Sequence, residues 1–413
     1  MQRIGVFFYF AVMEQNVQSS ASQGKRKWIN LLIFAFMAAL SQVMWLNFAA
    51  MLGFLQTAYQ VSEEVASLVI LVFPLAYVLF GFHAGRWIDR VGYRKVLIWA
   101  GLGMTVAATG RLFPFGFTGL LICQIGLSIV QPYIINAINA LVADGFTPEE
   151  QAGAVGLGTA AMFIGMALGI GLTPVLVDTM GFVNGMAVWA LASGVATLAC
   201  FIGLKETRKT NSSSASMAGV KALMKQPEMW RLLWVSLLAL GYFNGLTTFI
   251  ELILAEKNIS PEDSGLIAAV MILGGILGAI MVPLVSDKIG KRKPFILLAA
   301  FSALVLTYPL LQGGGLGWLM ILAAGLGFLF LPGYALLLSH AERVAGVSLA
   351  GTATGLLMIG GNAGAVLVIL GMQTLHGISG TWQTAVWGCM GILVLALCIA
   401  FFLRDNPNNK DCA

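Results

Sequence analysis

Uninterrupted apolar runs of about twenty residues recur along the whole chain. A helix that crosses the ~30 Å hydrocarbon core of a bilayer needs about 20 such residues. Strands of a membrane β-barrel would instead form segments of about ten residues with alternating polarity. The runs therefore predict an all-α membrane protein with twelve transmembrane helices, at residues 29–55, 64–84, 95–112, 116–142, 154–177, 183–203, 229–255, 264–284, 294–311, 316–339, 348–375 and 380–403.

Composition excludes most other classes of protein. Of 413 residues, 59% are hydrophobic and 10% are charged, whereas soluble domains carry about 25% charged residues. The net charge of +5 does not indicate nucleic acid, because the basic residues are spread between the apolar runs. The five cysteines lack metal-binding spacing, and the G-x-x-x-x-G-K-[ST] loop of ATPases is absent. No metal, cofactor or ATP-driven pumping is expected.

The basic residues predict how the chain lies in the membrane. With the N-terminus inside, all but two of the 23 Lys and Arg residues fall on the inner side, the exceptions being Arg111 and Lys257. Because the Lys and Arg bias of short loops sets orientation, both termini are predicted in the cytoplasm of a multi-pass protein of the cytoplasmic membrane.

A polar segment rich in serine divides the chain into two halves of six helices each. The predicted parts are an N-terminal tail (1–28), a first half (29–204), a flexible linker (205–228), a second half (229–403) and a C-terminal tail (404–413). The first tail contains an apolar stretch, 4–13, that is too short to span a bilayer. It is expected to be a disordered tail, or to precede a true start at Met13.

The two halves repeat one another. The segment 85–95 reads GRWIDRVGYRK and the segment 286–293 reads SDKIGKRK, so that Asp89 recurs 198 positions later as Asp287. At a similar offset, prolines recur in the fourth and tenth spans, and a Gly-x-x-x-Gly pair recurs in the fifth and eleventh: Gly165 with Gly169, and Gly360 with Gly364. Such pairs indicate surfaces on which helices pack closely.

The G-x-x-x-D-R-x-G-x-R-K segment resembles the signature loop of the major facilitator superfamily. The resemblance implies two six-helix halves that rock about a central cavity and expose it to each side in turn. Gly85 would permit close helix approach, Gly92 a tight turn, and Asp89 could accept from a helix N-terminus or an arginine. The alternative is that the basic residues only face anionic lipid. The predicted gating loop comprises Gly85, Asp89, Arg90, Gly92, Arg94, Lys95, Asp287, Lys288 and Gly290.

Neutral polar side chains and aromatic rings lie at mid-depth in the spans that line the cavity by resemblance. Amides can orient a solute by hydrogen bonds, and aromatic faces accept an apolar ring or a desolvated ammonium group. Alternatively, such amides bridge helices. The predicted substrate site comprises Trp45, Asn47, Gln131, Tyr133, Asn244, Thr248 and Asn362.

The stretches 42–47, 124–131 and 140–150 resemble the feline leukaemia virus subgroup C receptor family, a branch of this superfamily. Members of that family are associated with transport of choline, ethanolamine, haem or vitamin B6. In the family a tryptophan of the first span and a glutamine of the fourth help enclose the ligand, and these match Trp45 and Gln131. A tyrosine and a glutamine of the family are replaced here by Thr248 and Asn362.

Glu251 is the one carboxylate clearly within an apolar run. Because intramembrane charges are costly, it is either a coupling or substrate group or an interfacial carboxylate that faces water. We expect a monomeric secondary transporter of a small organic solute, with uniport favoured, and a proton-coupled multidrug or metabolite exporter as the alternative. The spans lack paired catalytic groups, so an enzyme is not expected, and the short tails argue against a signalling receptor.

Overall fold

The computed structural model describes residues 26–113, 115–205, 217–346 and 349–404, and every regular element in these ranges is a helix. The predicted stretch 4–13 and most of the two predicted tails lie outside the described residues. The first half contains an unlabelled helix Arg26–Leu46, α2 (Leu52–Tyr59), α3 (Glu63–Val91), α4 (Tyr93–Gly110), α5 (Gly116–Gly145), α6 (Pro148–Met180) and α7 (Phe182–Gly203). The second half contains α9 (Pro227–Ala255), α10 (Pro261–Ile289), α11 (Lys293–Leu311), α12 (Leu316–Ala345), α13 (Ala350–Ser379) and α14 (Trp382–Phe401).

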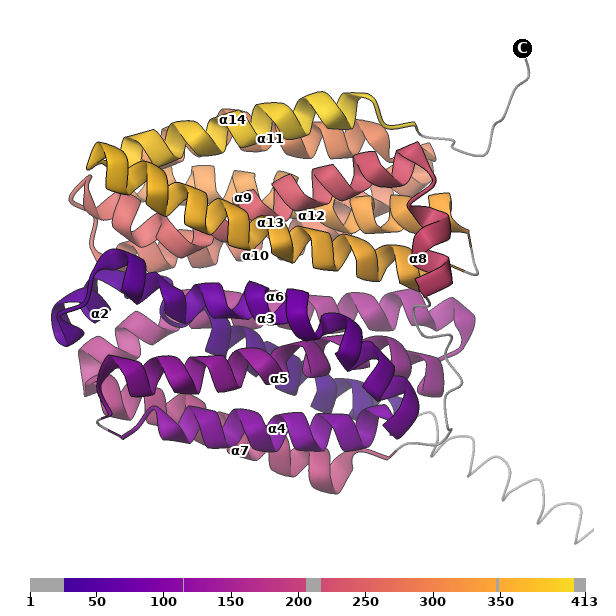
Figure 1. Ribbon diagram of the computed structural model, residues 1–413, viewed down its shortest axis with the longest axis horizontal. Coiled ribbons are helices and arrows are strands. Elements are labelled where there is room, and N and C mark those ends of the chain that lie inside the picture. The colour runs from indigo at the N-terminus through magenta and orange to yellow at the C-terminus, as the bar shows by residue number, and fades with distance from the viewer. Residues whose placement is uncertain (1–25, 114, 206–216, 347–348, 405–413) are drawn as a thin grey trace, which may run out of the picture.

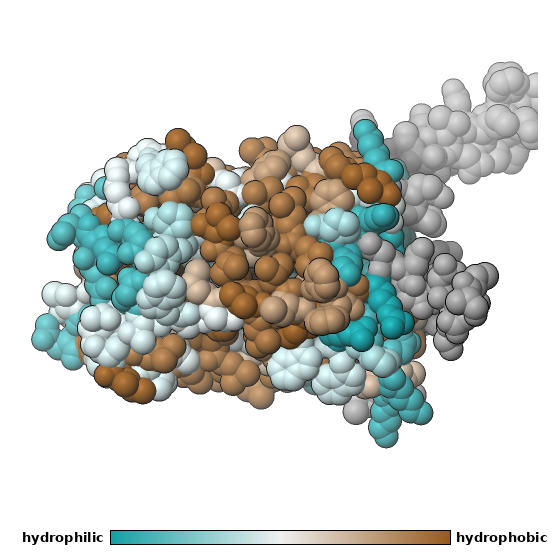
Figure 2. All heavy atoms as spheres, turned by 90° about the horizontal axis from the view of Figure 1, so that it is seen from above, coloured by the Kyte–Doolittle hydropathy of each residue, from teal (hydrophilic) through white to brown (hydrophobic). Residues whose placement is uncertain are grey.

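The twelve predicted helices are present, with two differences in their limits. Eleven are long and apolar enough to cross a membrane by length and composition. The twelfth, α4, begins with Arg94 and Lys95 in its first turn, which lowers its mean hydropathy. Figure 2 shows the resulting surface, an apolar belt between two polar ends. The protein is thus an all-α, multi-pass membrane protein.

The predicted continuous span 29–55 was wrong, because the first helix ends at Leu46 and the chain turns before α2 begins at Leu52. The predicted loop after the second span was also too long, since α3 continues to Val91 and includes Gly85, Asp89 and Arg90. The charged residues of that segment occupy the last two turns of a helix that extends beyond its apolar part. Charge therefore marks where a helix leaves the hydrocarbon, and not where it ends.

The two halves form two bundles that lie side by side in Figure 1, the first in indigo to magenta and the second in red to yellow. Between them the segment predicted as a flexible linker contains a short helix, α8 (Met217–Leu223). Its Leu223 is fully buried in a cluster with residues of the second half, including Leu357. Apolar side chains in this part of the linker account for its order.

Two ends of the bundle can be distinguished. We call the end that carries the α3–α4 and α10–α11 turns the basic end, and the opposite end the α2 end. The repeated glycines at the two turns, Gly92 and Gly290, have φ values of 91° and 74°, which favour glycine. Gly85 has open space within 4 Å of its Cβ position, so the close helix approach expected there is not present.

Within each half, glycines bring equivalent helices into backbone contact. A Cβ at Gly165 of α6 would lie 2.0 Å from the Ala39 carbonyl oxygen of the first helix. A Cβ at Gly364 of α13 would lie 1.9 Å from the Leu237 carbonyl oxygen of α9. Ala39 and Leu237 are 198 positions apart and Gly165 and Gly364 are 199 apart, so equivalent helices pack alike in the two halves, although the sequence pattern paired Gly165 with Gly360.

We predict that Gly165→Ala destabilises the protein, because the new methyl group collides with backbone atoms that cannot rotate away. Overpacking of this kind costs about 1–3 kcal/mol. Gly156→Ala in the same helix is the control, because nothing lies within 4 Å of its Cβ position and alanine stabilises a helix interior by about 0.5–1 kcal/mol. Thermal unfolding in detergent should give a lower melting temperature for G165A only. Equal melting temperatures would contradict the packing.

Candidate functional site

Polar contacts between the two halves gather at the α2 end. The Gln373 amide of α13 donates to the Ser67 hydroxyl of α3, and also to the Glu64 carbonyl oxygen at 3.4 Å. One turn on, His376 Nδ1 lies 3.2 Å from the Glu63 carboxylate. The Glu251 carboxylate of α9 accepts from the Gly53 backbone N–H of α2 at 3.2 Å. These bonds hold the first half against the second.

Close backbone packing between α6 and α10 adds to the closure of the α2 end. A Cβ at Gly265 would lie 2.7 Å from the Ile170 carbonyl oxygen, and one at Gly171 would lie 2.8 Å from Ala269. Toward the basic end, by contrast, glycines of α6 and α13 face open space. Nothing lies within 4 Å of the Cβ positions of Gly153, Gly156, Gly351 and Gly355. The halves are thus packed together at one end.

Buried polar atoms without partners lie near the end of the first helix and in the turn that follows it. Trp45 is 8% exposed, its ring centroid is 6.4 Å from that of Phe73, and its indole N–H has no acceptor in the described part of the chain. Asn47 is fully buried, and its Oδ1 also has no donor among these residues. Because an unsatisfied buried polar group is costly, both atoms are candidates for contact with a solute.

The second half contributes similar atoms from α9. Asn244 Oδ1 and Thr248 Oγ1 are buried and have no hydrogen-bond partner among the described residues. The amide nitrogen of Asn244 donates to the Leu240 carbonyl oxygen at 2.8 Å. The amide nitrogen of Asn362 donates to the Met358 carbonyl oxygen at the same distance. Asn362 is therefore partly satisfied by its own helix.

Gln131 and Tyr133 lie in the middle of α5 but have different surroundings. Gln131 is buried and donates to the Ser41 carbonyl oxygen at 3.3 Å, which connects α5 to the first helix. Tyr133 instead shares a 2.7 Å hydrogen bond with His83 and packs edge-on against Trp87. His83 is ten residues further along α3 than Phe73, or about 15 Å. Tyr133 is thus placed toward the basic end, apart from the surroundings of Trp45.

Tyr77 is a mid-depth residue that sequence analysis missed. Its hydroxyl donates to Asn136 Oδ1 at 2.7 Å, while the Asn136 amide donates to the Gly81 carbonyl oxygen at 3.0 Å. A single tyrosine in an apolar run is indistinguishable from a core residue by sequence alone. Only the packing brings these groups together.

Arg111 lies at the C-terminal end of α4, on the α2 side, and is 3% exposed inside the first half. Its guanidinium donates to Met44 Sδ at 2.8 Å and to Gln124 Oε1 at 3.4 Å, and lies 5.8 Å from the Phe48 ring centroid. Among the described residues no carboxylate forms an ion pair with it. A buried cation with neutral partners is expensive and therefore a candidate for function.

The predicted gating loop makes contacts within the first half. Arg94 Nε donates to the Leu204 carbonyl oxygen at 2.7 Å and its Nη2 to that of Phe201 at 3.2 Å, which ties the start of α4 to the end of α7. Lys95 and Lys288 are exposed, and the Asp287 side chain lies outside the described part of the structure. The gating role of this segment stays a prediction.

A second contact at the basic end joins the first helix to α6. Lys27 Nζ lies 2.6 Å from a carboxylate oxygen of Glu150. The hydrogen bond from Lys27 lowers the pKa of the Glu150 carboxyl group below its usual range. The pair therefore stays ionised at neutral pH, and it fixes two helix ends of the same half.

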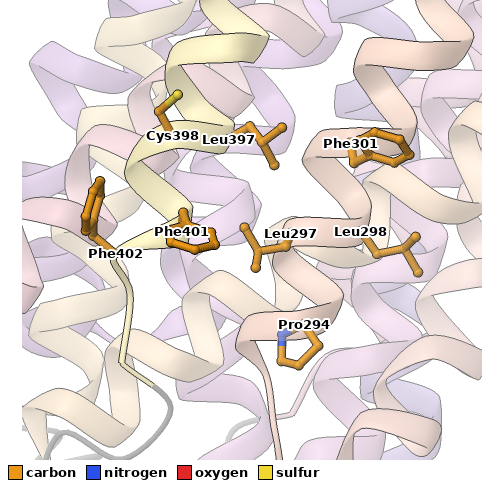
Figure 3. A pocket seen from close by; sticks show the side chains of 8 residues that line it. All are labelled: Pro294, Leu297, Leu298, Phe301, Leu397, Cys398, Phe401 and Phe402. Carbon is orange, nitrogen blue, oxygen red and sulfur yellow. The ribbon is translucent and has the colours of Figure 1, made fainter.

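An apolar groove lies on the outside of the bundle, away from the candidate site. It runs between α11 and α14 near the basic end (Figure 3). Leu298, Phe301 and Phe401 are exposed there, as residues that face lipid are. The lining residues are Pro294, Leu297, Leu298, Phe301, Leu397, Cys398, Phe401 and Phe402.

Two repeated six-helix bundles that close on each other at one end are the architecture of a membrane transporter. The chain belongs to the Major Facilitator Superfamily, whose family model matches residues 31–369 and 251–412.

Several proteins of this superfamily are similar to the chain. A choline/ethanolamine transporter of Danio rerio, flvcr2a, is 23% identical over 96% of this chain and 91% of its own. A D-galactonate transporter of Escherichia coli is 24% identical over 66% of this chain and 70% of its own. The fold matches a bacterial homologue of the human lysosomal transporter Spinster, solved inward-facing and unoccupied, with a TM-score of 0.69, 15% identity, and coverage of 92% of this chain and 96% of that one.

We predict that Arg111→Met leaves the melting temperature unchanged or raises it, because the substitution removes a buried charge that has only neutral partners. Gln124→Leu should lower the melting temperature. It removes a buried hydrogen bond to the Val69 carbonyl oxygen at 3.0 Å, and such a bond contributes about 0.5–1.5 kcal/mol. Thermal unfolding in detergent compares the two. A larger loss of stability in R111M than in Q124L would show that Arg111 is chiefly structural.

Proposed function

We propose that the protein is a secondary transporter of a small, amphipathic organic solute, of the cationic amine or vitamin-like class. The observation that supports this is the set of unpartnered buried polar atoms on Trp45, Asn47, Asn244 and Thr248. Two of these residues belong to each half, so a solute that bonds to both sets would couple its binding to the relative position of the halves.

The neutrality of these residues favours such a solute. Trp45 and the neighbouring Phe73 offer aromatic faces, and a buried ammonium group over such a face gains about 2 kcal/mol. The amides of Asn47 and Asn244 and the hydroxyl of Thr248 can orient a solute by hydrogen bonds without carrying a full charge. The similarity to choline/ethanolamine transporters supports an amine, whereas the D-galactonate transporter shows that relatives of other substrate chemistry exist.

The proposed setting is the cytoplasmic membrane, with the basic end and both termini in the cytoplasm, as the distribution of Lys and Arg favours. The closed α2 end then faces outward, and the arrangement corresponds to an inward-facing state. One chain supplies both halves, so a monomer suffices for transport. We favour uniport, because the four residues proposed to bind the solute include no carboxylate.

A proton-coupled exporter is the second candidate, and the burial of Glu251 favours it. This carboxylate is 3% exposed and is bonded to the first half. A group that changes its surroundings between two states can bind a proton in one and release it in the other. In such a cycle Glu251 would be the coupling residue.

We predict that Trp45→Ala or Gln131→Ala abolishes saturable transport in proteoliposomes, because each substitution removes a wall of the proposed site. Choline-like amines and B6 vitamers should raise the melting temperature of the wild-type protein, and the rise should vanish in W45A. Trp99→Ala is the control, since Trp99 is 63% exposed on the outer surface of α4. Wild-type kinetics in W45A and Q131A would refute the site.

We predict that Glu251→Gln leaves the ratio of transport along a pH gradient to solute counterflow unchanged, as uniport requires. Counterflow needs no net proton movement, so it corrects for any change in overall rate. Both rates are measured in the same proteoliposomes. Loss of pH-driven transport with counterflow retained would establish the proton-coupled exporter instead.

A further inference from the structure

Helix α2 begins without a cap of its own. The residue before it, Met51, makes no side-chain hydrogen bond to the helix. The first backbone N–H groups of any helix lack partners within the helix and need an acceptor from elsewhere. Leu52, the first residue of α2, is fully buried, so water does not readily supply that acceptor.

The acceptor is a carboxylate from the other half of the protein. Glu251 of α9 receives the Gly53 N–H at 3.2 Å. An anion at a helix N-terminus is further stabilised by the helix dipole. Among the described residues no Lys or Arg forms an ion pair with Glu251. The start of α2 is therefore its bonding partner.

The sequence repeat gives this contact its geometry. Gly53 and Glu251 are 198 positions apart, the same offset that relates Asp89 to Asp287. The two residues thus occupy equivalent places in the two halves and meet where the halves face each other. A Cβ at Gly53 would lie 3.0 Å from Glu251 Oε1, so a side chain there would press on the carboxylate. One half offers a carboxylate, and the other leaves room for it.

We infer that Glu251 caps helix α2 from the other half of the chain and thereby holds the α2 end of the transporter closed. When the halves separate at this end, the bond is lost, α2 starts without a cap, and a carboxylate loses its hydrogen-bond donor. The cap therefore biases the equilibrium toward the closed α2 end. This role holds whichever solute is carried, and it needs no proton transfer.

The test measures how often the α2 end opens. Ser264→Cys supplies a buried reporter thiol beside Gly265, which packs against the first half, in a protein whose five native cysteines are replaced by alanine. A charged, membrane-impermeant thiosulfonate added on the α2 side labels this thiol only when the halves part. Glu251→Ala should raise the labelling rate about fivefold, which corresponds to about 1 kcal/mol, the usual value of an N-cap.

Glu256→Ala is the matched control. This carboxylate lies on the same stretch of chain and also accepts a backbone N–H, from Trp382 at 2.9 Å, but both partners belong to the second half. Its loss should change the labelling rate by less than twofold. Equal rates in E251A and E256A, or no increase in E251A, would overturn the inference.

Gly53→Ala tests the contact from the other side and does not depend on E251A being well folded. The added methyl group should displace the Glu251 carboxylate and increase labelling in the otherwise unchanged protein. In the E251A background the same substitution should add nothing, because the group that it displaces is gone. Additive effects of the two substitutions would show that they act independently, which contradicts a shared cap.

Discussion

The hydrocarbon core of a bilayer offers no hydrogen bonds, so each backbone polar group must find its partner inside the protein. This constraint makes the spans helical, and it gives small residues their importance, because helices in lipid associate by close packing. The contacts of Gly165 with Ala39 and of Gly364 with Leu237 are the result. They bind the first helix to α6 and α9 to α13, so that each half is built on the same tightly packed helix pair.

The same constraint means that a break in a helix leaves backbone groups that need partners from elsewhere in the protein. The chain leaves helical geometry after Leu46 and resumes it at Leu52, which exposes backbone donors inside the membrane protein. One of those donors, the Gly53 N–H, is met by Glu251 from the opposite half. A local irregularity in one bundle is thereby satisfied only while the other bundle is in place. Irregular backbone at an interface between moving parts thus ties local geometry to the global state.

The mid-depth polar residues divide into two kinds. The amide nitrogens of Asn362 and Asn244 donate to carbonyl oxygens in the preceding turn of their own helices, as polar side chains in helices commonly do. Trp45, Asn47 and Thr248 retain atoms without partners in the described residues. Since similar proteins include a choline/ethanolamine transporter and a D-galactonate transporter, the fold alone does not set the solute.

The sequence by itself determined the membrane class, the twelve helices, the two halves and their repeat, because hydrophobic length and small-residue spacing are local properties of the chain. It also located Trp45, Asn47, Asn244 and Thr248, since a polar group in an apolar run is visible without a structure. It could not show that Arg111, at the outer end of its span, is buried inside the first half, nor could it separate Tyr133 from Trp45. Only the tertiary structure decided which polar atoms lack partners and which end is closed, because both depend on contacts between residues far apart in the chain, as Gly53 and Glu251 are.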